Sequence, residues 1–136
     1  MELQNIKPIS KKGTEILNSI VKMAKNANGY FKLDNTDSVF MPLSIDILGQ
    51  NDKNMNLSIC HYGEQNGDLM RDPEMCFLFI NENFYPYYFR NDYTGSENES
   101  LRFDNFMITG IRRNIYKGHL EFAEIWLKNI KHQQEI

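Results

Sequence analysis

The 136-residue chain has only two cysteines, Cys60 and Cys76, which argues against a disulfide-stapled scaffold or a finger-like zinc site. Both lie in apolar stretches, where reduced cysteines act as small hydrophobic side chains. The longest apolar run is six residues, at 75–80, whereas a membrane-spanning helix needs about 20. The first residues show no basic start followed by an apolar stretch, so we expect no secretory signal and a cytoplasmic location.

Sequence motifs of the common enzyme classes are also absent. The chain has no G-x-S-x-G elbow, no G-x-x-x-x-G-K-[ST] loop, no G-x-G-x-x-G fingerprint and no H-E-x-x-H pair. Cys60 and His61 are neighbours on an expected strand, where they point to opposite faces and cannot form a dyad. No catalytic residue is predicted, and an enzyme is the less favoured interpretation.

Positive charge is scarce in the middle of the chain. The net charge is −3, and residues 33–110 hold 13 acidic residues against four basic ones. Because Lys and Arg dominate contacts to phosphate, this region is a poor nucleic-acid surface. The terminal segments are mildly basic, and Arg112, Arg113 and Lys117 form the best basic cluster. A solvated helix face explains that cluster more simply than a nucleic-acid interface.

Hydrophobic periodicity predicts two helices with strands between them. The first helix has its apolar residues at helical spacing over 16–24, with Thr14 as its cap and Asn28-Gly29 as its end. The second runs to Lys131, with a stripe that begins at Leu120. Alternating apolar and polar residues predict strands at 40–48, 57–62, 74–80 and 84–89.

Short loops between successive strands indicate an antiparallel meander. We therefore predict an α+β fold, a two-layer sandwich in which an antiparallel sheet of about four strands packs against the N- and C-terminal helices. The length and the lack of a linker favour a single domain over 1–136, with 1–12 as a lead-in. Segments 64–73 and 91–99 are expected to be loops, and 100–106 a short extension.

The segment 61–75 concentrates carboxylates around one imidazole, which are donors that suit a divalent ion. Its candidate metal ligands are His61, Glu64, Asp68, Asp72 and Glu74. Ordinary turn chemistry explains the same residues, since Asn66-Gly67-Asp68 is a common turn sequence. We favour the turn, so no cofactor is predicted and a divalent metal remains the alternative.

The run from His61 to Phe77, HYGEQNGDLMRDPEMCF, resembles a domain of unknown function from proteins of bacterial plasmids, conjugative elements and phages. The likeness continues in the turn FRNDYTG at 89–95 and in a closing helix with Phe122, Trp126, Asn129, Ile130 and Gln133. It spans about residues 40–133. Gly63 departs from it, because a second aromatic or a polar residue is expected there. The resemblance implies that the protein is encoded on mobile DNA, and it implies no activity.

Aromatic side chains gather in residues 77–93, which hold eight of the chain's 17. Strand alternation places Phe84 and Tyr88 on one face and sends Tyr85, Tyr87 and Phe89 to the other, although Pro86 can break the phase. One face belongs to the core. The other is either an exposed aromatic platform for a partner or a face covered by helices, and we favour the second.

The sequence thus favours a non-enzymatic accessory protein of a bacterial mobile element that binds a protein partner. The residues expected to contact that partner are Glu64, Asn66, Asp68, Arg71, Tyr85, Tyr87 and Tyr88. Two alternatives stay open. One is a metal-dependent enzyme acting on nucleic acid or nucleotides through the 61–75 segment. The other is direct nucleic-acid binding through Arg112, Arg113 and Lys117.

Overall fold

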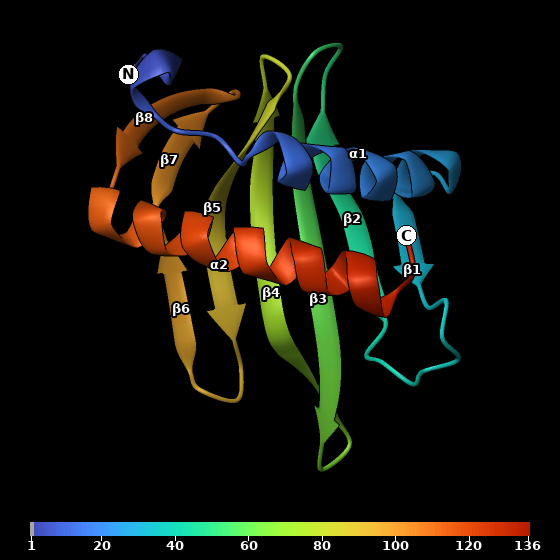
Figure 1. Ribbon diagram of the computed structural model, residues 1–136. Helices are drawn as coiled ribbons and strands as arrows, with labels where there is room; N and C mark the ends of the chain where they lie inside the picture. Colours follow the sequence, from blue (N-terminus) through green and yellow to red (C-terminus); the bar gives the residue numbers. More distant parts are fainter. Residues whose placement is uncertain (1) are drawn as a thin grey trace.

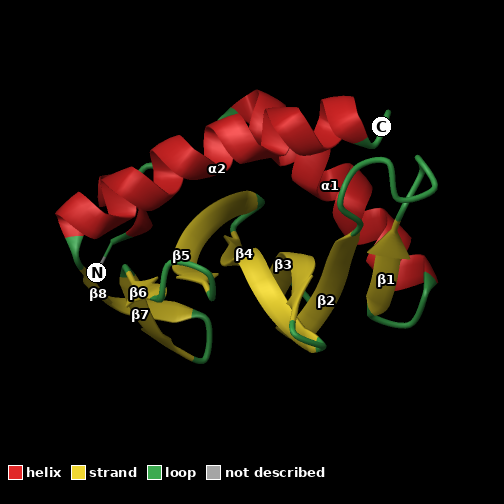
Figure 2. Cartoon of the chain, turned by 90° about the horizontal axis from the view of Figure 1, so that it is seen from below, coloured by secondary structure: helices red, strands yellow, loops and turns green. Residues whose placement is uncertain are grey.

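Two helices lie side by side on one face of an antiparallel sheet in this computed structural model, which describes residues 2–136 (Figure 1). A perpendicular view separates the helical layer from the curved sheet (Figure 2). The helices are α1 (Lys11–Asn26) and α2 (Arg113–Gln133), after a short 3-10 turn η1 (Leu3–Asn5). The strands are β1 (Tyr30–Leu33), β2 (Leu43–Gln50), β3 (Met55–Gln65), β4 (Asp68–Ile80), β5 (Asn83–Asn91), β6 (Ser96–Glu99), β7 (Leu101–Asp104) and β8 (Met107–Ile111). No helix among these residues is long and apolar enough to cross a membrane.

The α+β class and the antiparallel sheet are confirmed, but four strands is an undercount. Six strands pair in chain order from β1 to β6, and β7 pairs with β8 in a separate hairpin. Strands β2 to β5 are the four that the alternation indicates. The two edge strands were missed because each has only four residues and β6, Ser-Glu-Asn-Glu, has no apolar residue. Short, charged edge strands are the usual way to discourage edge-to-edge pairing. The expected loop at 91–99 is therefore wrong over β6.

The loop predicted over 64–73 is also wrong, because β3 and β4 continue through it as a long hairpin. Glu64 pairs with Leu69, and the turn consists of Asn66 and Gly67, both at positive φ (53° and 85°). Positive φ at both central residues is the turn that Asn-Gly favours between antiparallel strands. Residues 62–71, called here the β3–β4 arm, reach beyond the ends of the neighbouring strands (Figure 1).

Helix α1 begins earlier than predicted. Ser10, not Thr14, is its N-cap, and the Ser10 hydroxyl accepts a hydrogen bond from the Gly13 amide at 3.1 Å. The lead-in therefore ends at residue 10. The same hydroxyl donates to Glu124 of α2 at 3.0 Å and so ties the two helices together. The predicted end is confirmed, since the Gly29 amide bonds to the Ala24 carbonyl at 2.7 Å.

The main core lies between the helices and the sheet. Leu17 and Ile20 of α1 and Leu127 and Ile130 of α2 are fully buried there. Burying one such side chain contributes about 1.5–3 kcal/mol. The sheet residues of this core include Leu33, Leu43, Ile45, Leu57, Ile59, Met75, Phe77 and Phe84.

A second, smaller core lies on the other face of the sheet, where the β7–β8 hairpin covers part of β4 and β5. Leu101 and Ile108 of the hairpin pack there with Leu78, Tyr85 and Tyr87. Tyr85 is only 3% exposed and Tyr87 8%, so these two side chains form no exposed platform. A β-hairpin covers this part of the face, and not the helices that were expected. Tyr88, which was expected on the same face as Phe84, also packs on this side.

Phe89 was placed on the wrong face. The β4–β5 register shifts by one residue, so that Phe77 lies opposite Pro86 whereas Cys76 lies opposite Tyr88. This bulge changes the phase of the strand. As a result Phe89 packs against the helix-side core and contacts Phe122 edge-on, with ring centroids 5.4 Å apart.

His119 of α2 is buried against the sheet edge in a closed hydrogen-bonded group. The Ser100 hydroxyl lies 2.7 Å from its Nδ1, and its Nε2 bonds to Asn98 Oδ1. Both contacts are hydrogen bonds when the imidazole proton is on Nε2. His119 Nε2 then donates to Asn98, and the Ser100 hydroxyl donates to Nδ1. Burial lowers the pKa of His119 to about 4. Ser100 is itself fully buried, so this Ser–His–Asn group is a structural contact and not a catalytic triad.

A pH dependence of stability follows from His119. Its pKa is about 4 in the folded protein and about 6.5 in an unfolded chain, so the unfolded state binds more protons between these values. Stability is therefore lost as the pH falls from about 6.5 towards 4, and at pH 5 the loss from this residue is about 2 kcal/mol. Denaturant unfolding at pH 7 and pH 5 measures it.

The matched variants are His119→Gln and His132→Gln, the second at an exposed position near the end of α2. His119→Gln is expected to lose less stability than the wild type between pH 7 and pH 5, whereas His132→Gln behaves like the wild type. An unchanged pH dependence in His119→Gln would rule out this origin.

Candidate binding surface

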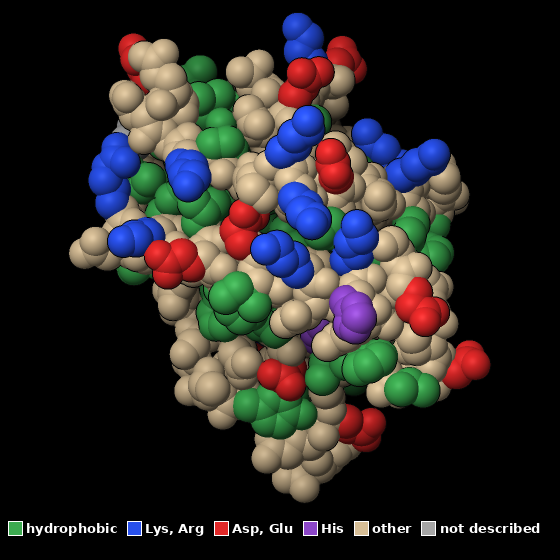
Figure 3. All heavy atoms as spheres, in the orientation of Figure 1, with side chains coloured by type: hydrophobic (Ala, Val, Ile, Leu, Met, Phe, Trp, Pro, Cys, Tyr) green, Lys and Arg blue, Asp and Glu red, His purple; other side chains and the backbone are tan. Residues whose placement is uncertain are grey.

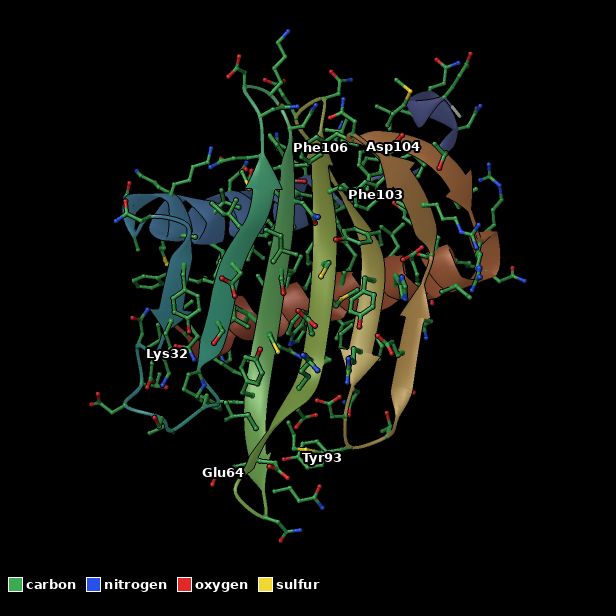
Figure 4. All side chains as sticks on the ribbon, turned by 180° about the vertical axis from the view of Figure 1, so that it is seen from behind. Lys32, Glu64, Tyr93, Phe103, Asp104 and Phe106 are labelled. Carbon is green, nitrogen blue, oxygen red and sulfur yellow. The ribbon has the colours of Figure 1, made fainter. Side chains whose placement is uncertain are left out.

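Within residues 2–136, the face of the sheet opposite the helices is uncovered over β1, β2, β3 and the part of β4 nearest the arm, while the β7–β8 hairpin covers part of β4 and β5 (Figure 4). The strand register lines up two rows of residues across all six strands of this face. The first row is Lys32, Ser44, Cys60, Glu74, Arg90 and Glu97. The second is Tyr30, Asp46, Ser58, Cys76, Tyr88 and Glu99. These rows, with Tyr62, Leu69 and Arg71 of the β3–β4 arm, are called here the uncovered face.

Glu74 is at the centre of this face and is well satisfied. It accepts a hydrogen bond from the Ser58 hydroxyl at 2.6 Å and pairs with the Arg71 guanidinium at 3.4 Å. Arg71 also lies 3.6 Å from Asp92, which sits between the two arginines. A half-buried carboxylate in a sheet is tolerated when such partners are present.

The chain of polar contacts continues to the edge of the sheet. Asp92 accepts from Arg90 at 2.9 Å, Arg90 lies 3.7 Å from Glu97, and the Tyr88 hydroxyl donates to Glu97. The Arg71 amide and the Arg90 side chain, both bonded to Asp92, hold the pKa of that carboxyl below its usual value. Both arginines are thus occupied by carboxylates and not available for phosphate.

The two thiols of the uncovered face are expected to be unreactive at neutral pH. Cys60 and Cys76 are free and buried beneath larger neighbours. Burial, with a contribution from the nearby Glu74 carboxylate, raises the pKa of each thiol to about 12. Because the thiolate is the form that attacks electrophiles, neither cysteine is an activated nucleophile at neutral pH.

A shallow hollow at the β1 side of the uncovered face contains its exposed apolar side chains. Tyr30 is 50% exposed, Tyr62 37% and Leu69 71%. The hollow is lined by these three residues together with Lys32, Pro42, Ser44 and Asp46. Exposed apolar side chains that share one hollow, with charges around them, are typical of an interaction site.

The β3–β4 arm brings four of the predicted partner-contacting residues to one edge of the face. Glu64, Asn66 and Asp68 are exposed at its tip, and Arg71 lies at its base. Tyr93 lies beside Glu64 (Figure 4). A Cβ at Gly63 would come 2.5 Å from the Tyr93 hydroxyl, so the aromatic or polar residue that the resemblance suggests there requires the Tyr93 side chain to move.

The predicted metal ligands are not brought together. Glu74 lies on the uncovered face and Asp68 at the arm tip, whereas His61 points to the helices, where its Nδ1 accepts from Trp126 at 3.4 Å. That bond leaves the proton on Nε2, which then has no lone pair for a metal. Across residues 2–136, no group of three or more His, Cys, Asp or Glu residues could hold a metal ion.

The predicted nucleic-acid residues do lie together, at the start of α2. Arg112, Arg113 and Lys117 are all exposed. Arg113 is partly engaged, because its guanidinium donates to the Asn5 carbonyl at 3.3 Å. The three residues occupy one end of the helical layer, away from the β3–β4 arm (Figure 1).

The chain matches one family model, described as "Domain of unknown function (DUF6908)", over residues 11–136. It belongs to the DUF6908 family. The match covers both helices and all eight strands, which is wider than the region of the sequence resemblance. No curated protein and no solved structure matches the chain. The resemblance to a domain of unknown function is therefore confirmed. All residues of the uncovered face lie within the matched part of this chain.

The cysteine environment predicts the reactivity of the native protein. With thiol pKa values of about 12, neither Cys60 nor Cys76 should react with iodoacetamide at pH 8 within an hour, whereas both should react in 6 M guanidinium. Mass spectrometry of the intact protein counts the labels. Rapid labelling of a native cysteine would contradict the packing of the uncovered face.

Proposed function

We propose that the protein is a non-enzymatic binding protein that engages a protein partner through the uncovered face and the β3–β4 arm. The observation that carries this proposal is the hollow formed by Tyr30, Tyr62 and Leu69. Arg71, Glu74 and Arg90 at the centre of the face are engaged in ion pairs, yet the three apolar side chains of the hollow remain in contact with solvent. A partner that covers them gains the burial energy that the fold itself leaves unused.

The chemistry of the face favours a protein over a nucleic acid. Its carboxylates, Asp46, Glu74, Glu97 and Glu99, outnumber its cations, Lys32, Arg71 and Arg90, and Asp92 adds a further carboxylate beside the two arginines. Phosphate groups would meet net negative charge and arginines that are already paired. Tyrosines surrounded by mixed charge suit the apolar centre and polar rim of a protein interface.

Among the described residues, the thiols of the face and the Ser100 hydroxyl are not activated as nucleophiles, which supports a binding role. The thiols of the face have pKa values of about 12, and the Ser100–His119 pair is enclosed in the core. The polar chain that contains Glu74 is internally satisfied, as expected of a structural network. The sequence resemblance adds the biological setting, a bacterial mobile element, so the partner is expected to be a protein of that element or of its host.

Site-specific photocrosslinking tests the proposal. The photoreactive amino acid p-benzoylphenylalanine is placed at Leu69 or Tyr62, and at Met107 of β8 as the control, in the native host. Leu69 and Met107 are matched, being 71% and 70% exposed. We expect one protein to crosslink from Leu69 and Tyr62 and not from Met107.

Substitution then measures the contribution of the hollow. Tyr62→Ala is expected to weaken binding of the crosslinked protein about 30-fold, as for an interface hot spot of about 2 kcal/mol, whereas Met107→Ala leaves it unchanged. Crosslinks that appear equally at all three positions, or an affinity that Tyr62→Ala does not alter, would refute the assignment of this face.

A further inference from the structure

The two layers of the molecule carry opposite charge. The helices contain eight of the chain's 15 basic residues and only three of its 18 acidic ones. In the space-filling view of the helical side, the Lys and Arg side chains gather over α1 and α2 (Figure 3). The basic residues of the helices are Lys11, Lys12, Lys22, Lys25, Arg113, Lys117, Lys128 and Lys131. The helices therefore have a net charge of +5, and the rest of the chain −8.

The positive charge of the helical layer is not neutralised within the protein. Every ion pair within 4.0 Å among residues 2–136 involves Arg71 or Arg90 on the uncovered face. Glu124, one of the three helical carboxylates, is instead bonded to Ser10. The lysines of the helices are all exposed, so their charge is directed to solvent.

A groove between α1 and α2 brings part of this charge together. Lys12 of α1 lines it opposite Lys128 and Lys131 of α2, which are three residues apart on one side of the helix. The remaining lining residues are Glu15, Ile16, Ser19, His132, Glu135 and Ile136. Glu15 and Glu135 accompany these three lysines, and the groove belongs to a helical layer whose net charge is +5.

We infer that this groove and the lysines around it bind the phosphate backbone of a nucleic-acid duplex. Charge complementarity selects the occupant, because a line of exposed, unpaired lysines matches a polymer of phosphates and releases its counterions. The cations of the groove are lysines, which bind phosphate as point charges. The binding is therefore independent of base sequence.

This surface differs from the one predicted from the sequence and from the one proposed for protein binding. Lys12, Lys128 and Lys131 come from the facing sides of two helices, whereas Arg112, Arg113 and Lys117 are consecutive or nearly so at one end of α2. The uncovered face lies on the other side of the sheet (Figure 2). Duplex and protein partner can thus be held at the same time.

The test is fluorescence anisotropy with a fluorescein-labelled 20-base-pair DNA duplex of arbitrary sequence, in 50–200 mM NaCl. The groove variant carries Lys12→Glu, Lys128→Glu and Lys131→Glu. The control variant carries Lys7→Glu, Lys53→Glu and Arg102→Glu, three exposed cations outside the helices with the same change in net charge. Circular dichroism melting verifies that both variants fold.

We expect the groove variant to bind at least tenfold more weakly than the control variant at 50 mM NaCl. The slope of log K against log [salt] should also fall by two to three for the groove variant, since each lost phosphate contact removes about 0.9. Equal weakening by both variants would mean attraction to net charge alone and would overturn the inference. So would the absence of wild-type binding, or equal competition by poly-glutamate, which would assign the groove to acidic proteins.

Discussion

The packing of both helices on the same face of the sheet is the constraint on which the rest of the structure depends. Leu17 and Ile20 of α1 and Leu127 and Ile130 of α2 bury one side of the sheet, and the Ser10–Glu124 hydrogen bond holds the helices together. Among the described residues, the β7–β8 hairpin covers the opposite side over part of β4 and β5, with Ile6 packed in the same core. Most of that face must be stable in contact with water.

The sequence of the uncovered face meets this requirement with paired charges and small side chains. Ser58, Glu74 and Arg71 satisfy one another at the centre, and the contacts run on through Asp92 and Arg90 to Glu97 at the sheet edge. Single exposed ion pairs contribute little, about 0–1 kcal/mol, so this network shapes the surface more than it stabilises the fold. Against this polar background, Tyr62 and Leu69 stand out as apolar groups that the fold does not use.

The division of charge between the layers gives the molecule two chemically distinct sides. The helical side displays unpaired lysines, and the sheet side displays carboxylates and occupied arginines. A protein partner on the sheet side and a phosphate polymer on the helical side would not compete for space. The two proposed interactions together describe an adaptor, an accessory role that needs no catalytic group.

The elements with strong hydrophobic periodicity were predictable from the sequence, namely α1, α2 and β2 to β5. The edge strand β6 was not, because a polar tetrapeptide gives no alternation, and the β3–β4 arm was hidden by its polar composition although Asn66-Gly67 signals its turn. The candidate site was predictable only in part.

Alternation places Tyr85 and Tyr87 on the same face but does not say which part of that face is covered, and here the β7–β8 hairpin buries them. Bulges matter as well, since one changed the face of Phe89. The predicted set of metal ligands was wrong for a related reason. His61 and Glu74 are close in the sequence, but they point to opposite sides of the sheet.

Hydrogen–deuterium exchange of the protein, free and in complex with its crosslinked partner after purification, tests the central claim most directly. The account predicts that amides of the β3–β4 arm and of β1 exchange more slowly in the complex, while those of α1 and α2 exchange at unchanged rates. Slower exchange confined to the helices, with the arm unchanged, would contradict the assignment of the uncovered face as the protein-binding surface.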